Sequence, residues 1–155
     1  MMQRLLYFAY GSNLLIDRLE ARVGKVEVFG KYNLVDYEVY ITPRGYADIR
    51  PNKGNIVEGI LYILTPTQHK RLDMFEAFYE KQHFIIDSEI ACVYIEKNMS
   101  RFHNDLNRLP TPDYLNCIIQ GAINFGLVDL AKQMDSYKIK TLKLKKYKKF
   151  NYENK

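Results

Sequence analysis

The feature that constrains the fold most is the first apolar run of the chain together with the turn that ends it. Residues 5–10 form a short apolar run typical of a buried strand, and Gly11-Ser12-Asn13 interrupts it. From Leu14 to Val23, apolar side chains recur at helical spacing. The pattern predicts a strand, a tight turn and a helix in succession. Backbone N–H groups at such a helix start can bind an anion, but an ordinary turn has the same residue types.

The rest of the chain predicts strands early and helices late. Strands are expected over 34–42, 47–51 and 56–64, with a bulge or a close backbone approach at Gly59, and a bent strand or tight hairpin over 83–86 and 89–95. Thr65-Pro66 and Thr111-Pro112 each combine an N-cap with proline at the first helical position. The first opens a helix to about Tyr79; the second opens one that Gly126 ends, before a last short helix over 129–137. This order favours an α+β fold over alternating βαβ units.

The length and charge distribution predict one domain and a basic tail. A chain of 155 residues with 47% hydrophobic residues is long enough for a single core. Residues 138–155 hold eight lysines and one glutamate, a charge of +7, so residues 1–137 carry −2 of the total of +5. We expect a domain over 1–137 and a flexible tail over 138–155. The tail has few side chains placed to stack on bases, so a solvated end is favoured over one that binds nucleic acid or an acidic partner.

The cysteines, histidines and N-terminus bear on compartment and metal content. Cys92 and Cys117 show no CxxC spacing and have apolar neighbours, which indicates buried free thiols in a reducing compartment. Gly11 breaks the N-terminal apolar run too early for a signal peptide, and no stretch approaches the ~18 apolar residues of a membrane span. A cytoplasmic protein with no membrane partner is expected. His69, His83 and His103 show no metal-ligand spacing, so no metal is expected.

Glu76 is the unusual charge in the predicted helix 66–79. Leu72, Phe75 and Tyr79 define its apolar side, and Glu76 lies about 40° from Leu72 within that stripe. An ionised carboxylate there costs free energy unless it is paired or lines a cavity, and partial burial raises its pKa toward neutrality. A general acid/base has that property. A glutamate at the rim, paired with an arginine or lysine, is the alternative.

Several motifs together resemble the γ-glutamylcyclotransferase (AIG2-like) family. Residues 6–15 (LYFAYGSNLL) resemble the opening of these enzymes, and 57–62 (VEGILY) resemble a family strand. Residues 72–76 (LDMFE) are similar to the L-D-x-x-E segment that carries the catalytic glutamate. Pro112, Tyr114 and the GA and GL pairs at 121–122 and 126–127 resemble the family's last conserved helix. The resemblance covers about residues 5 to 128, in the family's order.

The resemblance implies a mixed β-barrel surrounded by helices and an activity that needs no cofactor. The implied reaction is release of 5-oxoproline from γ-glutamyl amino acids or γ-glutamyl amines, with Glu76 as catalytic acid/base. The implied substrate-binding residues are Tyr10, Gly11, Ser12, Asn13 and Leu14 in the turn and Tyr114, which borders the site. The Y-G-S-N-L form resembles the general branch of the family, so free glutathione is the less favoured substrate.

Three departures from the family pattern lie after the glutamate. Ala77 replaces a common glycine, His83 stands where some members have tyrosine, and the segment from Glu76 to Tyr94 is shorter than in many members. These changes affect the side of the pocket that receives the leaving amine. A larger leaving group, such as a protein lysine side chain, is the second enzymatic hypothesis. The non-enzymatic alternative is a small-molecule-binding module with a polyanion-binding tail. The sequence fixes neither the leaving amine nor the oligomeric state, with which a homodimer is compatible.

Overall fold

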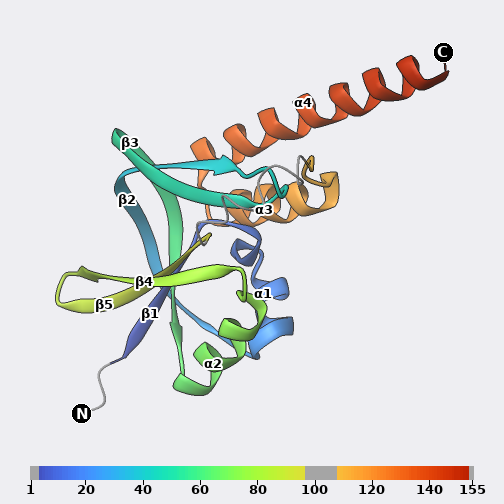
Figure 1. The fold of residues 1–155 in the computed structure, drawn as a ribbon. Coiled ribbons are helices and arrows are strands. Elements are labelled where there is room, and N and C mark those ends of the chain that lie inside the picture. Colours follow the sequence, from blue (N-terminus) through green and yellow to red (C-terminus); the bar gives the residue numbers. More distant parts are fainter. Residues whose placement is uncertain (1–3, 97–107, 154–155) are drawn as a thin grey trace.

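The computed structural model describes residues 4–96 and 108–153, and the predicted polar connection over 97–107 lies outside them. The described residues form ten elements, whose arrangement is shown in Figure 1. They are β1 (Leu5–Ala9), a 3₁₀ turn (Ser12–Leu14), α1 (Ile16–Val23), β2 (Glu27–Ile41), β3 (Ala47–Leu64), α2 (Pro66–Phe75), β4 (Tyr79–Ile86), β5 (Glu89–Glu96), α3 (Pro112–Asn124) and α4 (Val128–Glu153).

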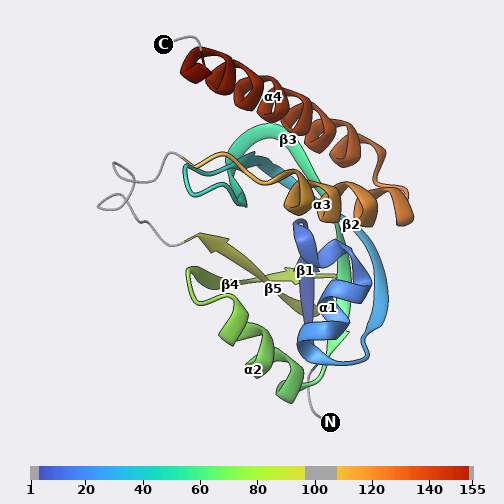
Figure 2. The same ribbon diagram turned by 90° about the vertical axis from the view of Figure 1, so that its right-hand side faces the viewer.

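One five-stranded sheet with the strand order β2-β3-β1-β5-β4 organises the described residues. β1 is its central strand and pairs antiparallel with β3 and parallel with β5. Helices α1, α2 and α3 gather on one side of the sheet (Figures 1 and 2). The α+β class is confirmed. The sheet is open, with β2 and β4 as its edges, and does not close into the barrel that the family resemblance implied.

Strand β3, which pairs with β2 in a long hairpin, contains two strands that the sequence predicted separately, 47–51 and 56–64. Tyr37 pairs with Pro51 and Val35 pairs with Ile56, so residues 52–55 form an irregular excursion within one continuous strand. Asp36 and Gly54 have positive φ angles of 64° and 90° there. The Asp36 carboxylate accepts a hydrogen bond from the Gly54 N–H at 2.9 Å, which stabilises the excursion locally. Pro51 therefore does not end the strand.

The core forms around β1, whose Leu6 and Phe8 side chains are fully buried. Gly59 of β3 lies against Phe8, and a Cβ atom at this position would be 2.4 Å from the Phe8 ring. The close approach predicted at Gly59 is confirmed. Of the two cysteines, Cys92 is buried in this core and Cys117 is half-buried, and both are free thiols.

Both predicted helix caps are confirmed. The Thr65 hydroxyl accepts a hydrogen bond from the Gln68 N–H, and the Gln68 side chain accepts one from the Thr65 N–H, which completes a capping box. Thr111 caps α3 through the Tyr114 N–H at 3.1 Å. The predicted end of the first of these helices was wrong, because α2 stops at Phe75 and Tyr79 begins β4.

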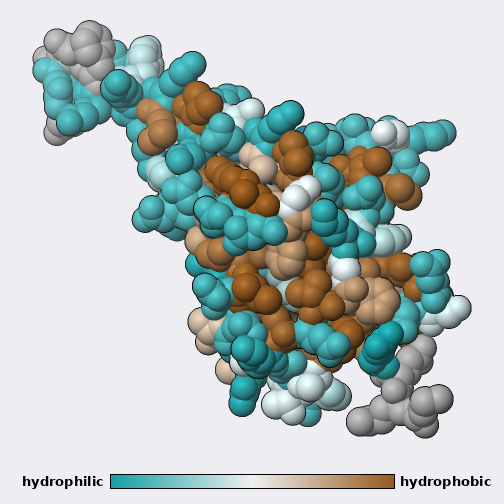
Figure 3. Space-filling model, turned by 180° about the vertical axis from the view of Figure 1, so that it is seen from behind, coloured by the Kyte–Doolittle hydropathy of each residue, from teal (hydrophilic) through white to brown (hydrophobic). Residues whose placement is uncertain are grey.

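Helix α4 is much longer than the short helix predicted over 129–137. Its first half packs on the core through Leu130 and Met134, and its second half projects from the body (Figures 1 and 2). The projecting part has a mostly hydrophilic surface with apolar side chains between the polar ones (Figure 3). The basic segment, for which the sequence predicted a flexible tail, is thus helical to Glu153. None of the described helices is long and apolar enough to cross a membrane.

We propose that the core does not depend on the end of this helix. Thr141 is buried, whereas the described side chains after it are exposed, apart from the half-buried Asn151. A chain that ends at Thr141 is therefore expected to change its free energy of unfolding by about 1 kcal/mol or less. Chemical denaturation of the truncated and full-length chains measures this difference. A loss of several kcal/mol would mean that the basic segment is part of the folding unit.

Candidate active site

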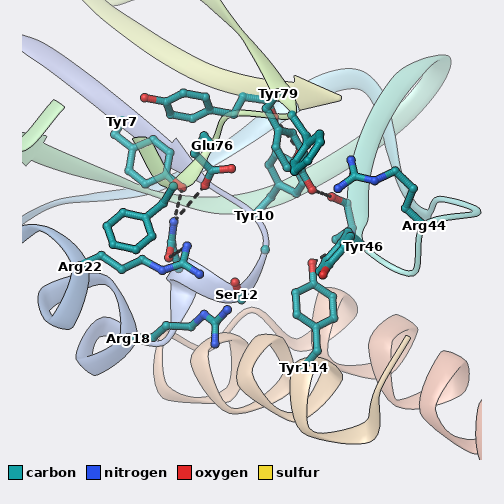
Figure 4. Close-up of a pocket in the computed structure, with 16 residues that line it drawn as sticks. Tyr7, Tyr10, Ser12, Arg18, Arg22, Arg44, Tyr46, Glu76, Tyr79 and Tyr114 are labelled. Atoms are coloured by element: carbon teal, nitrogen blue, oxygen red, sulfur yellow. Dashed lines mark hydrogen bonds between the residues drawn. The ribbon is translucent and has the colours of Figure 1, made fainter. Parts of the chain in front are cut away.

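A cavity of about 300 Å³ opens between the end of β1, α1, the loop before β3, the end of α2 and the start of α3. Its volume is at the lower end of the range for small-molecule sites. Tyrosines and three arginines dominate its lining (Figure 4). The lining residues are Tyr7, Tyr10, Gly11, Ser12, Asn13, Arg18, Arg22, Arg44, Tyr46, Ala47, Phe75, Glu76, Phe78, Tyr79, Tyr94 and Tyr114.

The turn after β1 forms the floor of the cavity. The Leu14 N–H donates to the Gly11 carbonyl at 3.0 Å, which closes the turn. Within the described part of the chain, the N–H groups of Ser12 and Asn13 have no acceptor and remain available. Of the five turn residues named from the sequence, the structure brings Tyr10, Gly11, Ser12 and Asn13 to the cavity. Leu14 does not line it, because its side chain is buried in the core.

The buried Asn13 side chain links three other groups of the site. Its amide nitrogen donates to the Tyr7 hydroxyl at 3.0 Å and to Oε1 of Glu76 at 3.4 Å. Its amide oxygen accepts from Nη1 of Arg22 at 3.3 Å. Because both ends of its amide group are hydrogen-bonded, Asn13 is held in one orientation and in turn orients the carboxyl group of Glu76 and the guanidinium of Arg22.

Glu76 lies at the C-cap of α2, where φ is −103° and ψ is 34°. Its N–H donates to the Leu72 carbonyl at 3.1 Å, and its carbonyl accepts from the Tyr79 N–H at 2.9 Å, so its backbone joins the helix to β4. Its side chain points into the cavity (Figure 4). The predicted apolar side of this helix, on which Glu76 was identified, is only partly confirmed. Leu72 is buried, whereas Phe75 is 54% exposed because the helix ends there.

Burial raises the pKa of the Glu76 carboxyl from its ordinary value of 4.5 to about 7. The positive charges of Arg22 and Arg18 oppose this rise. No ion pair of Glu76 occurs within the described ranges 4–96 and 108–153. The carboxyl group is therefore suited to gain and lose a proton near neutral pH.

Tyr10 and Tyr114 contribute differently to the cavity. The Tyr114 hydroxyl accepts a hydrogen bond from the Ala47 N–H at 2.8 Å, which leaves its own proton available to a ligand. The Tyr10 hydroxyl donates to the Tyr94 carbonyl at 2.7 Å. Tyr10 therefore forms a fixed wall, and Tyr114 presents a donor.

Sequence reasoning missed the three arginines of the cavity. Arg18 and Arg22 lie four residues apart on α1, a spacing that places them on one face of the predicted helix and could have drawn attention to both. Arg44 lies in the loop 42–46, for which the sequence offered no signal. Its guanidinium pairs with Glu96 at 2.9 Å and lies 4.4 Å from the centre of the Phe78 ring.

The cavity thus combines a carboxyl group that titrates near neutral pH with a turn whose Ser12 and Asn13 N–H groups have no acceptor among the described residues. This arrangement suits proton transfer beside a developing negative charge. Among the residues that the structure describes, no three His, Cys, Asp or Glu side chains converge as a metal site would require.

Comparisons with known proteins give one consistent result. The family model described as gamma-glutamyl cyclotransferase, AIG2-like, matches residues 7–116. A human protein named gamma-glutamylcyclotransferase is 27% identical over 135 residues, which is 79% of this chain and 72% of that protein. A solved structure of a gamma-glutamyl cyclotransferase superposes with a TM-score of 0.69 at 22% identity and covers 86% of this chain and 87% of that one. The fold is also that of an uncharacterized human protein, with a TM-score of 0.68 at 22% identity, covering 86% of this chain and 88% of that one.

Proposed function

The chain belongs to the gamma-glutamyl cyclotransferase, AIG2-like family, and we propose that it releases 5-oxoproline from γ-glutamyl amino acids or γ-glutamyl amines. The observation that carries the proposal is the Glu76 carboxyl group, with a pKa of about 7, which lines the same cavity as the Gly11–Asn13 turn. The free thiols fit a reducing cytoplasm, where we place the protein.

In the proposed reaction the substrate supplies its own nucleophile. The α-amino group of the γ-glutamyl unit attacks the γ-carbonyl carbon, forms the C–N bond of a five-membered lactam, and the C–N bond to the amine breaks. Holding the substrate in a folded conformation supplies much of the rate of such an intramolecular attack. The tyrosine walls and the Tyr114 hydroxyl are the groups that would hold it.

Glu76 would move the protons. As a carboxylate it takes a proton from the α-ammonium group, whose reference pKa is near 8, and frees the nitrogen lone pair. As a carboxylic acid it returns this proton to the leaving nitrogen. After ring closure the lactam nitrogen loses a second proton, which Glu76 takes up and passes to the departing amine. The amine therefore leaves as an ammonium ion, and Glu76 is a carboxylate again. The N–H groups of Ser12 and Asn13 would stabilise the oxyanion of the tetrahedral intermediate.

The pKa of Glu76 predicts an acid limb in the pH profile. Because the carboxylate is the active base, kcat/KM should fall about tenfold per pH unit below pH ~7, as Glu76 becomes protonated. Initial rates between pH 5 and 8 measure the limb, with circular dichroism to show that the protein stays folded. A flat profile over this range would exclude Glu76 as the titrating base.

A substrate panel tests the proposed activity as a whole. γ-Glutamyl amino acids, small γ-glutamyl amines and a γ-glutamyl group on a protein lysine side chain are offered separately, and released 5-oxoproline is measured. We expect release from at least one class, and the class identifies the leaving amine. Ligand binding without release from any of them would instead favour a non-catalytic binding module.

A further inference from the structure

Arg18 and Arg22 bring two positive charges to the cavity, where Glu76 supplies at most one negative charge. Neither guanidinium forms an ion pair within the described residues, whereas Arg44 is paired with Glu96. Glu76 does not offset them fully, since a carboxyl group with a pKa of about 7 is largely neutral at slightly acidic pH. The cavity lining therefore has an excess of positive charge, which favours an anionic ligand.

Arg18 and Arg22 differ in the contacts that their guanidinium groups make within the protein. Arg22 donates to Asn13 and lies 5.0 Å from the centre of the Phe75 ring. Arg18 has a buried Nε–H without a hydrogen-bond partner among the described residues. A buried donor left unpaired costs free energy, and a guanidinium donor more than a neutral one. Figure 4 shows the Arg18 side chain reaching from α1 to the region beside Ser12, across the cavity from Glu76.

The γ-glutamyl unit has one anionic group throughout the proposed reaction, its α-carboxylate. Guanidinium groups bind carboxylates through charge-assisted hydrogen bonds. If Arg18 takes the α-carboxylate, the N–H groups of Ser12 and Asn13 stay free for the oxyanion, which develops only during the reaction. We infer that Arg18 is the ligand of the α-carboxylate and makes this group a required feature of the substrate. The inference deepens the proposed function and rests on it for the identity of the ligand.

The product allows binding to be measured without turnover. 5-Oxoproline keeps the carboxylate, and 5-oxoprolinamide has the same lactam ring with a neutral amide in its place. The wild-type protein is expected to bind 5-oxoproline about 10- to 100-fold more tightly than the amide, the range for a charge-assisted hydrogen bond. Isothermal titration calorimetry at pH 7 measures both affinities.

Arg18→Met and a matched control test whether Arg18 causes the preference for 5-oxoproline over 5-oxoprolinamide. Arg18→Met should lose the preference for 5-oxoproline and keep the wild-type affinity for the amide. Arg50→Met should keep both, because Arg50 pairs with Glu38 on the surface and does not line the cavity. Equal or absent binding of the two ligands by the wild type would overturn the inference. So would an Arg18→Met variant that keeps the preference, or one that loses affinity for both ligands by the same factor.

The substrate panel separates this inference from the proposed function. If the wild type releases no 5-oxoproline from any γ-glutamyl compound and the preference still depends on Arg18, the cyclotransferase proposal fails and the carboxylate site stands. If release occurs and Arg18→Met leaves the preference intact, the reaction stands and the carboxylate has another ligand.

Discussion

Replacing Glu76 with glutamine is expected to slow 5-oxoproline release by at least ~10²-fold, the scale for loss of a general acid/base. Glutamine is nearly isosteric, and its side-chain oxygen can still accept from the Asn13 amide, as Oε1 of Glu76 does at 3.4 Å. It cannot take a proton from the α-ammonium group. The loss should therefore appear in kcat, with little change in 5-oxoproline affinity. Steady-state assays at pH 7.5 give the rate, and calorimetry gives the affinity.

The stability of this variant distinguishes lost chemistry from lost folding. The pKa of Glu76 is raised in the folded state, so its protonated form favours folding below the ordinary value of 4.5, and this contribution is lost as the pH rises through about 7. Glutamine does not ionise, so the variant should be more stable than the wild type at pH 8. Glu80→Gln, on an exposed residue of β4, is the matched control and should turn over like the wild type. A Glu76→Gln rate within a few-fold of wild type would contradict the assigned role.

Gly121→Ala is expected to destabilise the protein, although alanine is normally the better helix former by about 1 kcal/mol. Gly121 lies in α3 against the turn after β1, and a Cβ atom would be 2.4 Å from the Leu14 carbonyl carbon and 2.5 Å from the Leu15 nitrogen. These are backbone atoms, which cannot move aside without shifting the turn. We expect the free energy of unfolding to fall by about 1–3 kcal/mol, the range for overpacked sites, and the melting temperature by several degrees.

Gly121→Ala should also lower kcat/KM. The backbone that it would displace, at Leu14 and Leu15, follows directly after Ser12 and Asn13 in the chain, so the turn that lines the cavity would shift with it. Asn116→Ala places an alanine at an exposed position of the same helix and should change the free energy of unfolding by about 0.5 kcal/mol or less. Thermal unfolding and substrate assays on both variants give the comparison. Gly121→Ala as stable and as active as Asn116→Ala would show that the contact between α3 and the turn does not shape the site.

Local signals were enough to predict the parts of the site that depend on short segments. The Gly11-Ser12-Asn13 turn and both Thr-Pro caps are encoded within a few residues, and all three occur in the structure. Glu76 was identified although the predicted helix, 66–79, was longer than α2. The buried Leu72, one turn earlier, defines the inward side of the helix, and Glu76 at the C-cap still points to that side.

What sequence reasoning missed depends on long-range packing. Arg44 reaches the cavity because the loop 42–46 lies beside β5, where Glu96 pairs with it. No spacing within the loop encodes that contact. The unpaired state of Arg18 is equally invisible in sequence, since it depends on which carboxylates of other elements lie nearby. The excursion at 52–55 has a local cause in Asp36 and Gly54, but only the pairing of β2 with β3 shows that one strand continues through it.

In the proposed reaction the substrate closes on itself while Glu76 moves the protons, and the origin of the oxygen atoms in the product tests this mechanism. A γ-glutamyl amide is incubated with the protein in H₂¹⁸O, and the products are analysed by mass spectrometry beside Glu76→Gln and enzyme-free controls. We expect 5-oxoproline without ¹⁸O, an equimolar amount of free amine, and more product than in either control. Glutamate carrying one ¹⁸O atom would show that water is the nucleophile and would rule out the proposed mechanism, and 5-oxoproline formed equally fast by the Glu76→Gln variant would rule out the role of Glu76.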